Sequence, residues 1–133
     1  MGMSMRDRLL YQLRRYLVRS PIGRAELLEL VKSPRAGMVI IETLPAKHFH
    51  GGHLPCAINV PNDEHFERAI QQAVPDKDRQ VIVYCWNSHC ESAYDAARKM
   101  ELIGYSNVFV YEEGKEAWQQ AGGPIESPAG APS

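Results

Sequence analysis

The chain has 133 residues, a formal net charge of −1, and an ordinary globular composition with 44% apolar and 23% charged residues. This balance argues against a nucleic-acid binder, which carries a marked basic excess, and no apolar run reaches the roughly 18 residues that a membrane span needs. With no signal-peptide pattern and three cysteines, Cys56, Cys85 and Cys90, the chain is expected to be cytoplasmic with reduced thiols.

Residues 1–20 form the first expected element, a basic amphipathic helix that extends the domain. Five arginines stand against one aspartate between Met5 and Ser20, and apolar side chains recur at helical spacing from Met5 to Leu17. One apolar stripe is what a helix docked on its own domain shows, whereas a helix for a membrane surface or an acidic partner is the alternative. This helix is where we expect a homodimer contact or partner docking.

The remaining chain alternates between short apolar runs and helix-like patterns, and we place one domain over residues 21–126. Helices are expected over 24–33, 62–74, 92–103 and 112–121, strands over 38–41, 57–61, 81–84 and 107–111, and a loop over 46–56. Strands that are apolar throughout are covered on both faces, as parallel strands are. The pattern therefore predicts an α/β domain with a central parallel sheet flanked by helices, followed by a flexible tail over 127–133.

The stretch VIVYCWNSHCES places Cys85 at the end of an apolar strand and Cys90 just before a helix that begins at Ser92. Loops that follow parallel strands gather at one edge of the sheet, where ligands bind. The backbone N–H groups and the dipole of the helix start stabilise a nearby anion, so we expect the pKa of Cys85 to lie below the free value of ~8.5. The sequence therefore predicts an accessible, activated thiolate at Cys85; the alternative is a buried and inert thiol.

Cys90 is interpreted either as loop filler or as a resolving thiol for Cys85, which requires Cα atoms about 4.4–6.8 Å apart. HFHGGH supplies three histidines and His89 precedes Cys90, and His and Cys are the residue types that bind zinc. Neither cluster has the paired spacing of a zinc site, so no metal is expected. His48, His50 and His65 are instead expected to be exposed polar residues.

From Arg24 to Glu126 the chain resembles the rhodanese homology superfamily, as a single-domain member. MVIIETLPAKHFHGGHLPCAINVP resembles the family stretch that ends Gly-His-Ile-Pro-Gly-Ala-x-Asn-x-Pro, and the segment after it resembles the active-site cysteine loop and the closing Gly-Tyr and Ala-Trp motifs. The resemblance implies a three-layer rhodanese-like fold, no cofactor, and sulfur transfer through a cysteine persulfide. By position, Cys85 is the persulfide-forming nucleophile. The backbone amides of the loop after Cys85 would surround the sulfur. This loop consists of Trp86, Asn87, Ser88, His89, Cys90 and Glu91.

The chain departs from the family pattern at three places. The common loop reads Cys-x-x-Gly-x-Arg, but no Arg follows Cys85 here; the loop instead fits the Cys-x4-Cys subset. Glu42-Thr43-Leu44 replaces Asp-Val-Arg, and Cys56, which we interpret as structural, replaces a Gly. An Arg would attract thiosulfate through a charge-assisted bond, so its loss favours a protein persulfide, a polysulfide or a small persulfide as donor.

Two functions follow from these residues. The first is a sulfurtransferase in which Cys85 accepts sulfane sulfur and passes it to a thiol acceptor, with Cys90 able to resolve the persulfide as a disulfide. The alternative is a catalytically weak rhodanese-fold module that binds a partner or senses oxidation through Cys85 and Cys90.

Overall fold

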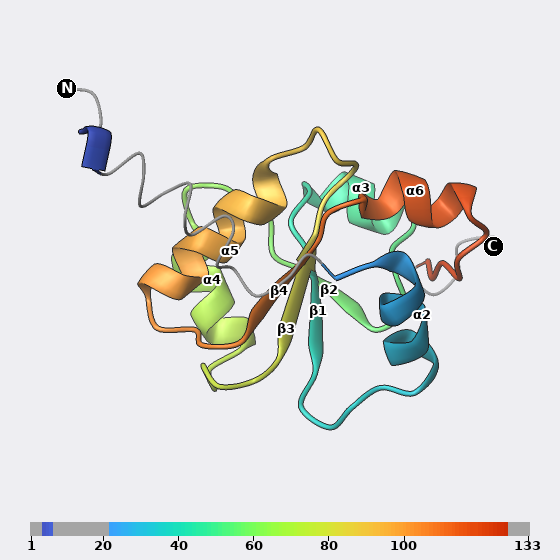
Figure 1. Cartoon of the computed structure of the whole chain (residues 1–133), viewed down its shortest axis with the longest axis horizontal. Helices are drawn as coiled ribbons and strands as arrows, with labels where there is room; N and C mark the ends of the chain where they lie inside the picture. Colours follow the sequence, from blue (N-terminus) through green and yellow to red (C-terminus); the bar gives the residue numbers. More distant parts are fainter. Residues whose placement is uncertain (1–3, 7–21, 128–133) are drawn as a thin grey trace.

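The computed structural model describes residues 4–6 and 22–127 (Figure 1). The expected helix over 1–20 lies almost wholly outside the described residues, and so does the expected tail over 127–133. Within the described ranges, none of the helices has the length and apolar character required to cross a bilayer.

Four parallel strands form the centre of the domain, and they confirm the predicted α/β class. In chain order they are β1 (Val39–Glu42), β2 (Ala57–Asn59), β3 (Val81–Tyr84) and β4 (Val108–Tyr111), and their order in the sheet is β2-β1-β3-β4. Every residue of β1 and β3 is buried, because helices cover the sheet on both faces.

The helices make the outer two of three layers (Figure 1). Helices α4 (Phe66–Ala73) and α5 (Ser92–Leu102) cover one face, while α2 (Arg24–Lys32), α3 (Ala46–His50) and α6 (Gly114–Gln120) cover the other. Side chains alternate along each strand, so odd-numbered residues of β1 and β3 pack against α4 and α5 and even-numbered residues face the other layer. The Cys85 side chain therefore belongs to the layer of α4 and α5.

Two local predictions are wrong. The expected loop over 46–56 begins with α3, which follows Pro45, a residue whose fixed φ suits the approach to a helix. The carbonyls of His48, in the last turn of α3, and of Gly52, just after the helix, accept hydrogen bonds from Lys115, a partner that the local sequence does not reveal. Helix α4 begins at Phe66 instead of residue 62, because Asp63 accepts a hydrogen bond from the His65 amide in a turn before the helix.

Candidate active site

Cys85 follows β3 at the carboxyl edge of the sheet, and the loop after it leads into α5. Thr43, at the end of the neighbouring strand, joins the two ends of this loop. Its amide and its hydroxyl both donate to the Tyr84 carbonyl, at 3.0 and 3.1 Å, and its Oγ1 lies 2.6 Å from Oγ of Ser92. The start of the loop and the start of α5 are thus fixed to β1 by one side chain.

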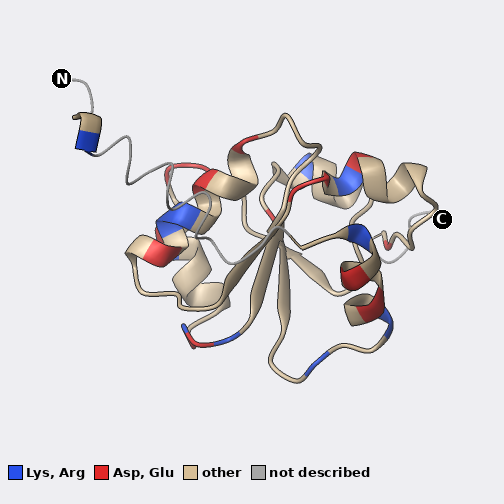
Figure 2. Ribbon diagram, viewed as in Figure 1, with Lys and Arg blue, Asp and Glu red and all other residues tan. Residues whose placement is uncertain are grey.

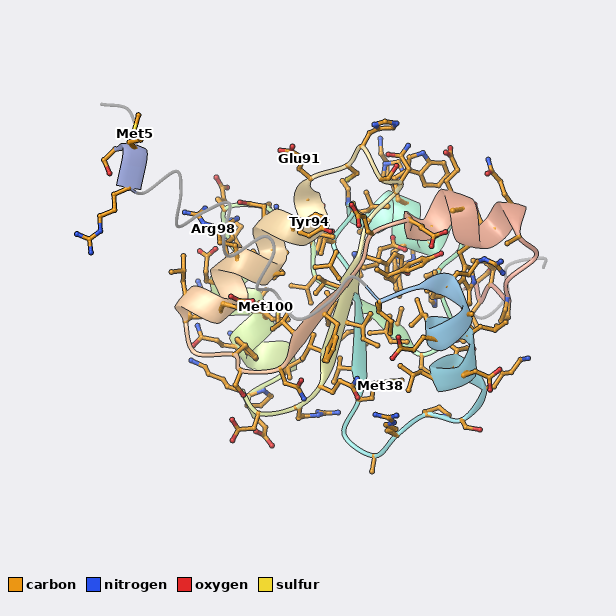
Figure 3. All side chains as sticks on the ribbon, viewed as in Figure 1. Met5, Met38, Glu91, Tyr94, Arg98 and Met100 are labelled. Carbon is orange, nitrogen blue, oxygen red and sulfur yellow. The ribbon has the colours of Figure 1, made fainter. Side chains whose placement is uncertain are left out.

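Asn87 organises the loop itself. Its carbonyl accepts from the Cys90 amide at 3.0 Å, and its Oδ1 accepts from the His89 amide at 3.0 Å. Two of the amides that we expected around the sulfur are therefore used inside the loop. Between β3 and α5 the loop carries one acidic residue and neither Lys nor Arg (Figure 2). That acid, Glu91, is exposed and points away from the domain (Figure 3).

The first turn of α6 holds the loop from the opposite side. The amide of Lys115 donates to the Cys85 carbonyl at 2.9 Å, and the amide of Glu116 donates to the Trp86 carbonyl at 2.8 Å. Gly114 makes this approach possible, because its φ is +81° and a Cβ there would lie 2.6 Å from the carbonyl carbon of Trp86. The backbone of the cysteine loop is therefore packed directly against the backbone of α6.

A buried ion pair anchors this turn of α6. Lys115 Nζ lies 2.9 Å from Glu42 Oε1, and the two side chains are 3% and 0% exposed. The ammonium also donates to the carbonyls of His48 and Gly52, at 2.9 and 2.8 Å, so its three donors are all used. The Tyr84 hydroxyl donates to the same carboxylate oxygen at 2.8 Å, and burial and the Glu42 charge raise the pKa of that tyrosine.

Sequence reasoning missed this network. In the sequence, Glu42 is only the replacement for an aspartate, and Lys115 looks like an exposed position in a short helix. The one available signal was an acid at the end of an otherwise apolar strand, since a buried charge needs a partner.

The two loop cysteines lie together but in different surroundings. Cys85 is only 2% exposed, and its thiol donates to the Cys90 carbonyl at 3.2 Å. Burial, followed by the hydrogen bond with the Cys90 side chain, raises the pKa of Cys85 to about 12, although the amides of Ala93 and Trp86 act in the opposite direction. The expectation of a lowered pKa at Cys85 is therefore wrong for this structure.

Cys90 has the lowered pKa instead. Its partial burial works against the thiolate, but hydrogen bonds from the Cys85 thiol, the amides of Trp86 and Ser92, and the Ser92 hydroxyl outweigh that effect. The stabilising groups that we expected for the first cysteine thus act mainly on the second. The Trp86 amide is shared between the two sulfurs.

Cys56 and the histidines stand apart from this site. Cys56 precedes β2, at the opposite edge of the sheet from Cys85; it is exposed and has a φ of +64°, which explains why the family has a Gly there. His48, His50 and His65 are exposed, as predicted. Among the described residues, no group of three or more His, Cys, Asp or Glu is placed to hold a metal ion.

Comparison with known proteins identifies the family. A model described as the rhodanese-like domain matches residues 24–121. The chain belongs to the rhodanese-like domain family. The assignment rests on most of the chain and agrees with the fold and with the position of Cys85 at the end of β3.

Two curated proteins and one solved structure are similar to this rhodanese-like domain. It is 32% identical over 114 residues to the HTH-type transcriptional regulator Rv0324 of Mycobacterium tuberculosis, covering 85% of this chain and 48% of that protein. It is 35% identical over 85 residues to the adenylyltransferase and sulfurtransferase UBA4 of Candida albicans, covering 60% and 19%. The chain thus spans less than half the length of either relative. The BH2092 protein of Bacillus halodurans has the same fold, with a TM-score of 0.74 at 24% identity over 92% of this chain and 86% of that one.

Proposed function

We propose that this rhodanese-like domain is a sulfurtransferase that carries sulfane sulfur as a persulfide on Cys85 and passes it to a thiol acceptor. The observation that carries the proposal is the position of Cys85. It ends β3 at the carboxyl edge of a parallel sheet, and the amides of Trp86 and Ala93 stabilise a negative charge on its sulfur. A persulfide anion on that sulfur would keep the same two donors. The name of the C. albicans relative, which includes a sulfurtransferase, agrees with this chemistry.

The charge of the loop supports a persulfide or polysulfide donor over thiosulfate. A doubly charged oxyanion is held by a cation or by several amides pointing at one place. Here the only charged side chain from Trp86 to Glu91 is an exposed acid, and the amides of His89 and Cys90 bind Asn87. A persulfide needs only an approachable thiolate. All three cysteines are free, which suits a reducing compartment such as the cytoplasm.

The test is the intact mass of the full chain after mixing with thiosulfate and, separately, with a polysulfide. The Cys56→Ser variant serves as the starting protein, because Cys56 is an exposed thiol outside the site. We expect a gain of one sulfur from the polysulfide, a much smaller gain from thiosulfate, and no retained sulfur at neutral pH once Cys85 and Cys90 are both replaced by Ser. If neither donor loads either cysteine, the enzyme proposal fails, and a partner-binding or oxidation-sensing module is left.

A further inference from the structure

The two loop thiols differ in how a donor can reach them. Cys85 is 2% exposed, and its thiol donates to the Cys90 carbonyl at 3.2 Å. Cys90 packs against the same apolar cluster but is partly exposed. Attack on a sulfur donor requires a roughly linear approach of the donor to the attacking sulfur. A donor that arrives from solvent therefore meets Cys90 before it can reach Cys85.

The surroundings of the pair also favour the negative charge on Cys90. The Cys85 thiol has one proton, and the Cys90 carbonyl accepts it at 3.2 Å. Burial raises the pKa of Cys85, whereas hydrogen bonds from the Cys85 side chain, the Trp86 amide and Ser92 lower the pKa of Cys90 despite its partial burial. Two nearby thiols joined in this way share one negative charge, and the hydrogen-bond donors around the outer sulfur favour its charge.

Thr43 supports the same arrangement from β1. Its hydroxyl lies 2.6 Å from the Ser92 hydroxyl and 3.1 Å from the Tyr84 carbonyl. The Thr43 hydroxyl uses its one proton on the Tyr84 carbonyl, so it accepts from Ser92. Thr43 therefore fixes the position of the Ser92 hydroxyl, which also lowers the pKa of Cys90.

We infer that Cys90 is the thiol that first attacks the sulfur donor and that it relays the sulfane sulfur inward to Cys85. This inference rests on the proposed function and changes the order of its steps: Cys85 stores the sulfur, but Cys90 receives it. Cys90 is then a catalytic residue, while Ser92 and Thr43 are positioning residues that act through it.

Both steps are thiol–disulfide exchanges that need no added oxidant. In the first, the Cys90 thiolate attacks the outer sulfur of a persulfide R–S–SH; the new S–S bond forms as the donor S–S bond breaks, and RS⁻ leaves and takes the proton of the transferred sulfur, so that Cys90–S–S⁻ and RSH result. In the second, the proton of Cys85 passes to the outer sulfur of the Cys90 persulfide, and the Cys85 thiolate attacks that sulfur. One S–S bond again forms as one breaks, and Cys90 leaves as the thiolate with which the cycle began.

The experiment follows the position of the sulfur with time in the full chain carrying Cys56→Ser. The protein is mixed with an equimolar low-molecular-weight persulfide, quenched with an alkylating reagent at a series of times, and digested so that mass spectrometry locates the extra sulfur. In the parent protein we expect the Cys90 persulfide to form first and the Cys85 persulfide to replace it. With Cys85→Ser, the sulfur should stay on Cys90, because a serine hydroxyl can still donate to the outer thiolate.

The decisive variant is Cys90→Ser, which removes the entry thiol and leaves the storage thiol in place. We expect Cys85 to load roughly tenfold more slowly or worse, since it is buried and protonated near neutral pH. The Cys90→Ser variant loading as fast as the parent, or Cys85 carrying the sulfur first in the parent, would overturn the relay and leave the sulfurtransferase proposal intact. No loading of either cysteine by this donor or by polysulfide would overturn both.

A second readout addresses Ser92 without relying on sulfur transfer. The rate of Cys90 alkylation by iodoacetamide is measured against pH, with the exposed Cys56 of the same chain as an internal reference. We expect Ser92→Ala to move the midpoint for Cys90 to higher pH, Ser92→Thr to restore it, and Cys56 to keep its midpoint in both. An unchanged midpoint in Ser92→Ala would overturn the assignment of Ser92 and Thr43 as positioning residues.

Discussion

The two faces of the sheet use the same strands but hold their helices in different ways. The face under α4 and α5 is packed almost entirely from apolar side chains, among them Phe66, Ile70 and Met100. The face under α2, α3 and α6 adds a buried carboxylate and a buried ammonium to its apolar core. Apolar packing has no preferred direction, whereas the Lys115 ammonium fixes α6 against three named oxygens.

The difference has a functional meaning, because the helix held by the ion pair is the one that holds the cysteine loop. The loop backbone binds the first turn of α6, while the thiols themselves face the apolar layer. Helix α6, on one face of the sheet, therefore fixes the position of the cysteine loop. The layer of α4 and α5, on the other face, gives Cys85 its apolar environment.

The largest effect is expected from Lys115→Met, which keeps the length of the side chain but removes the charge that fixes α6 on its face of the sheet. It leaves Glu42 buried without a counter-ion, so we expect the free energy of unfolding to fall by about 3–5 kcal/mol in urea denaturation. Adding Glu42→Gln to this variant should restore much of the loss. A loss as small as that of a surface ion pair would contradict the role of the buried pair.

Gly114→Ala tests the contact between α6 and the loop directly. The added Cβ meets the Trp86 carbonyl at 2.6 Å in a backbone conformation that disfavours side chains, so we expect a loss of about 2 kcal/mol and a changed alkylation rate at Cys90. The matched control is Gly122→Ala, where φ is +77° but no atom lies within 4 Å of the new Cβ. In that control the free energy of unfolding should fall by about 1 kcal/mol, and the alkylation rate at Cys90 should stay unchanged.

High pH should destabilise the domain because the buried thiol of Cys85 and the buried phenol of Tyr111 resist losing their protons. Burial raises the pKa of Cys85 to about 12 and, with the Glu113 charge, raises that of Tyr111 to about 12. In the unfolded chain these groups lose their protons near pH 8.5 and 10, so stability is complete below these values and falls as the pH rises toward 12. Each group contributes about 1.4 kcal/mol per pH unit in that window. Cys85→Ser should flatten the fall that begins near pH 9, and Tyr111→Phe the part that begins near pH 10; parallel curves would contradict the assignment.

The smallest effect is expected on the apolar face. Ile70, in α4, is fully buried in the apolar cluster, and Ile70→Val removes one methylene group without changing a charge or a hydrogen-bonding group. We expect a loss of about 1 kcal/mol and no change in the alkylation rates of Cys85 and Cys90. A changed rate at either thiol would show that the apolar layer also positions the loop.

The parts of this fold that the sequence predicted are those whose causes are local. The runs MVII and VIVY identify β1 and β3 because two covered faces demand apolar side chains at every position. Cys85 could be placed at the sheet edge for the same reason. The three-layer arrangement followed from strands alternating with helices.

The parts that could not be predicted depend on partners far away in the chain. Helix α3 looked like a loop because its carbonyl end is capped by Lys115, which lies 63 to 67 residues away from those carbonyls. The pKa values of the two cysteines depend first on how deeply each thiol is buried and then on which sulfur receives hydrogen bonds from the neighbouring side chains and amides. A spacing of four residues between the cysteines is compatible with either order, so only three-dimensional geometry distinguishes the inner thiol from the outer one.

The contact between the first strand and the last helix also has a consequence during synthesis on the ribosome. Glu42 and Lys115 are 73 residues apart, and Cys85 lies between them. The cysteines leave the ribosome before the segment that holds their loop, because domains are made from the N-terminus at a finite rate. Until Lys115 emerges and α6 docks, both thiols belong to an unlocked loop open to oxidation. Released chains that are truncated before residue 115 should therefore react with a thiol reagent at both cysteines, and the full chain mainly at Cys90.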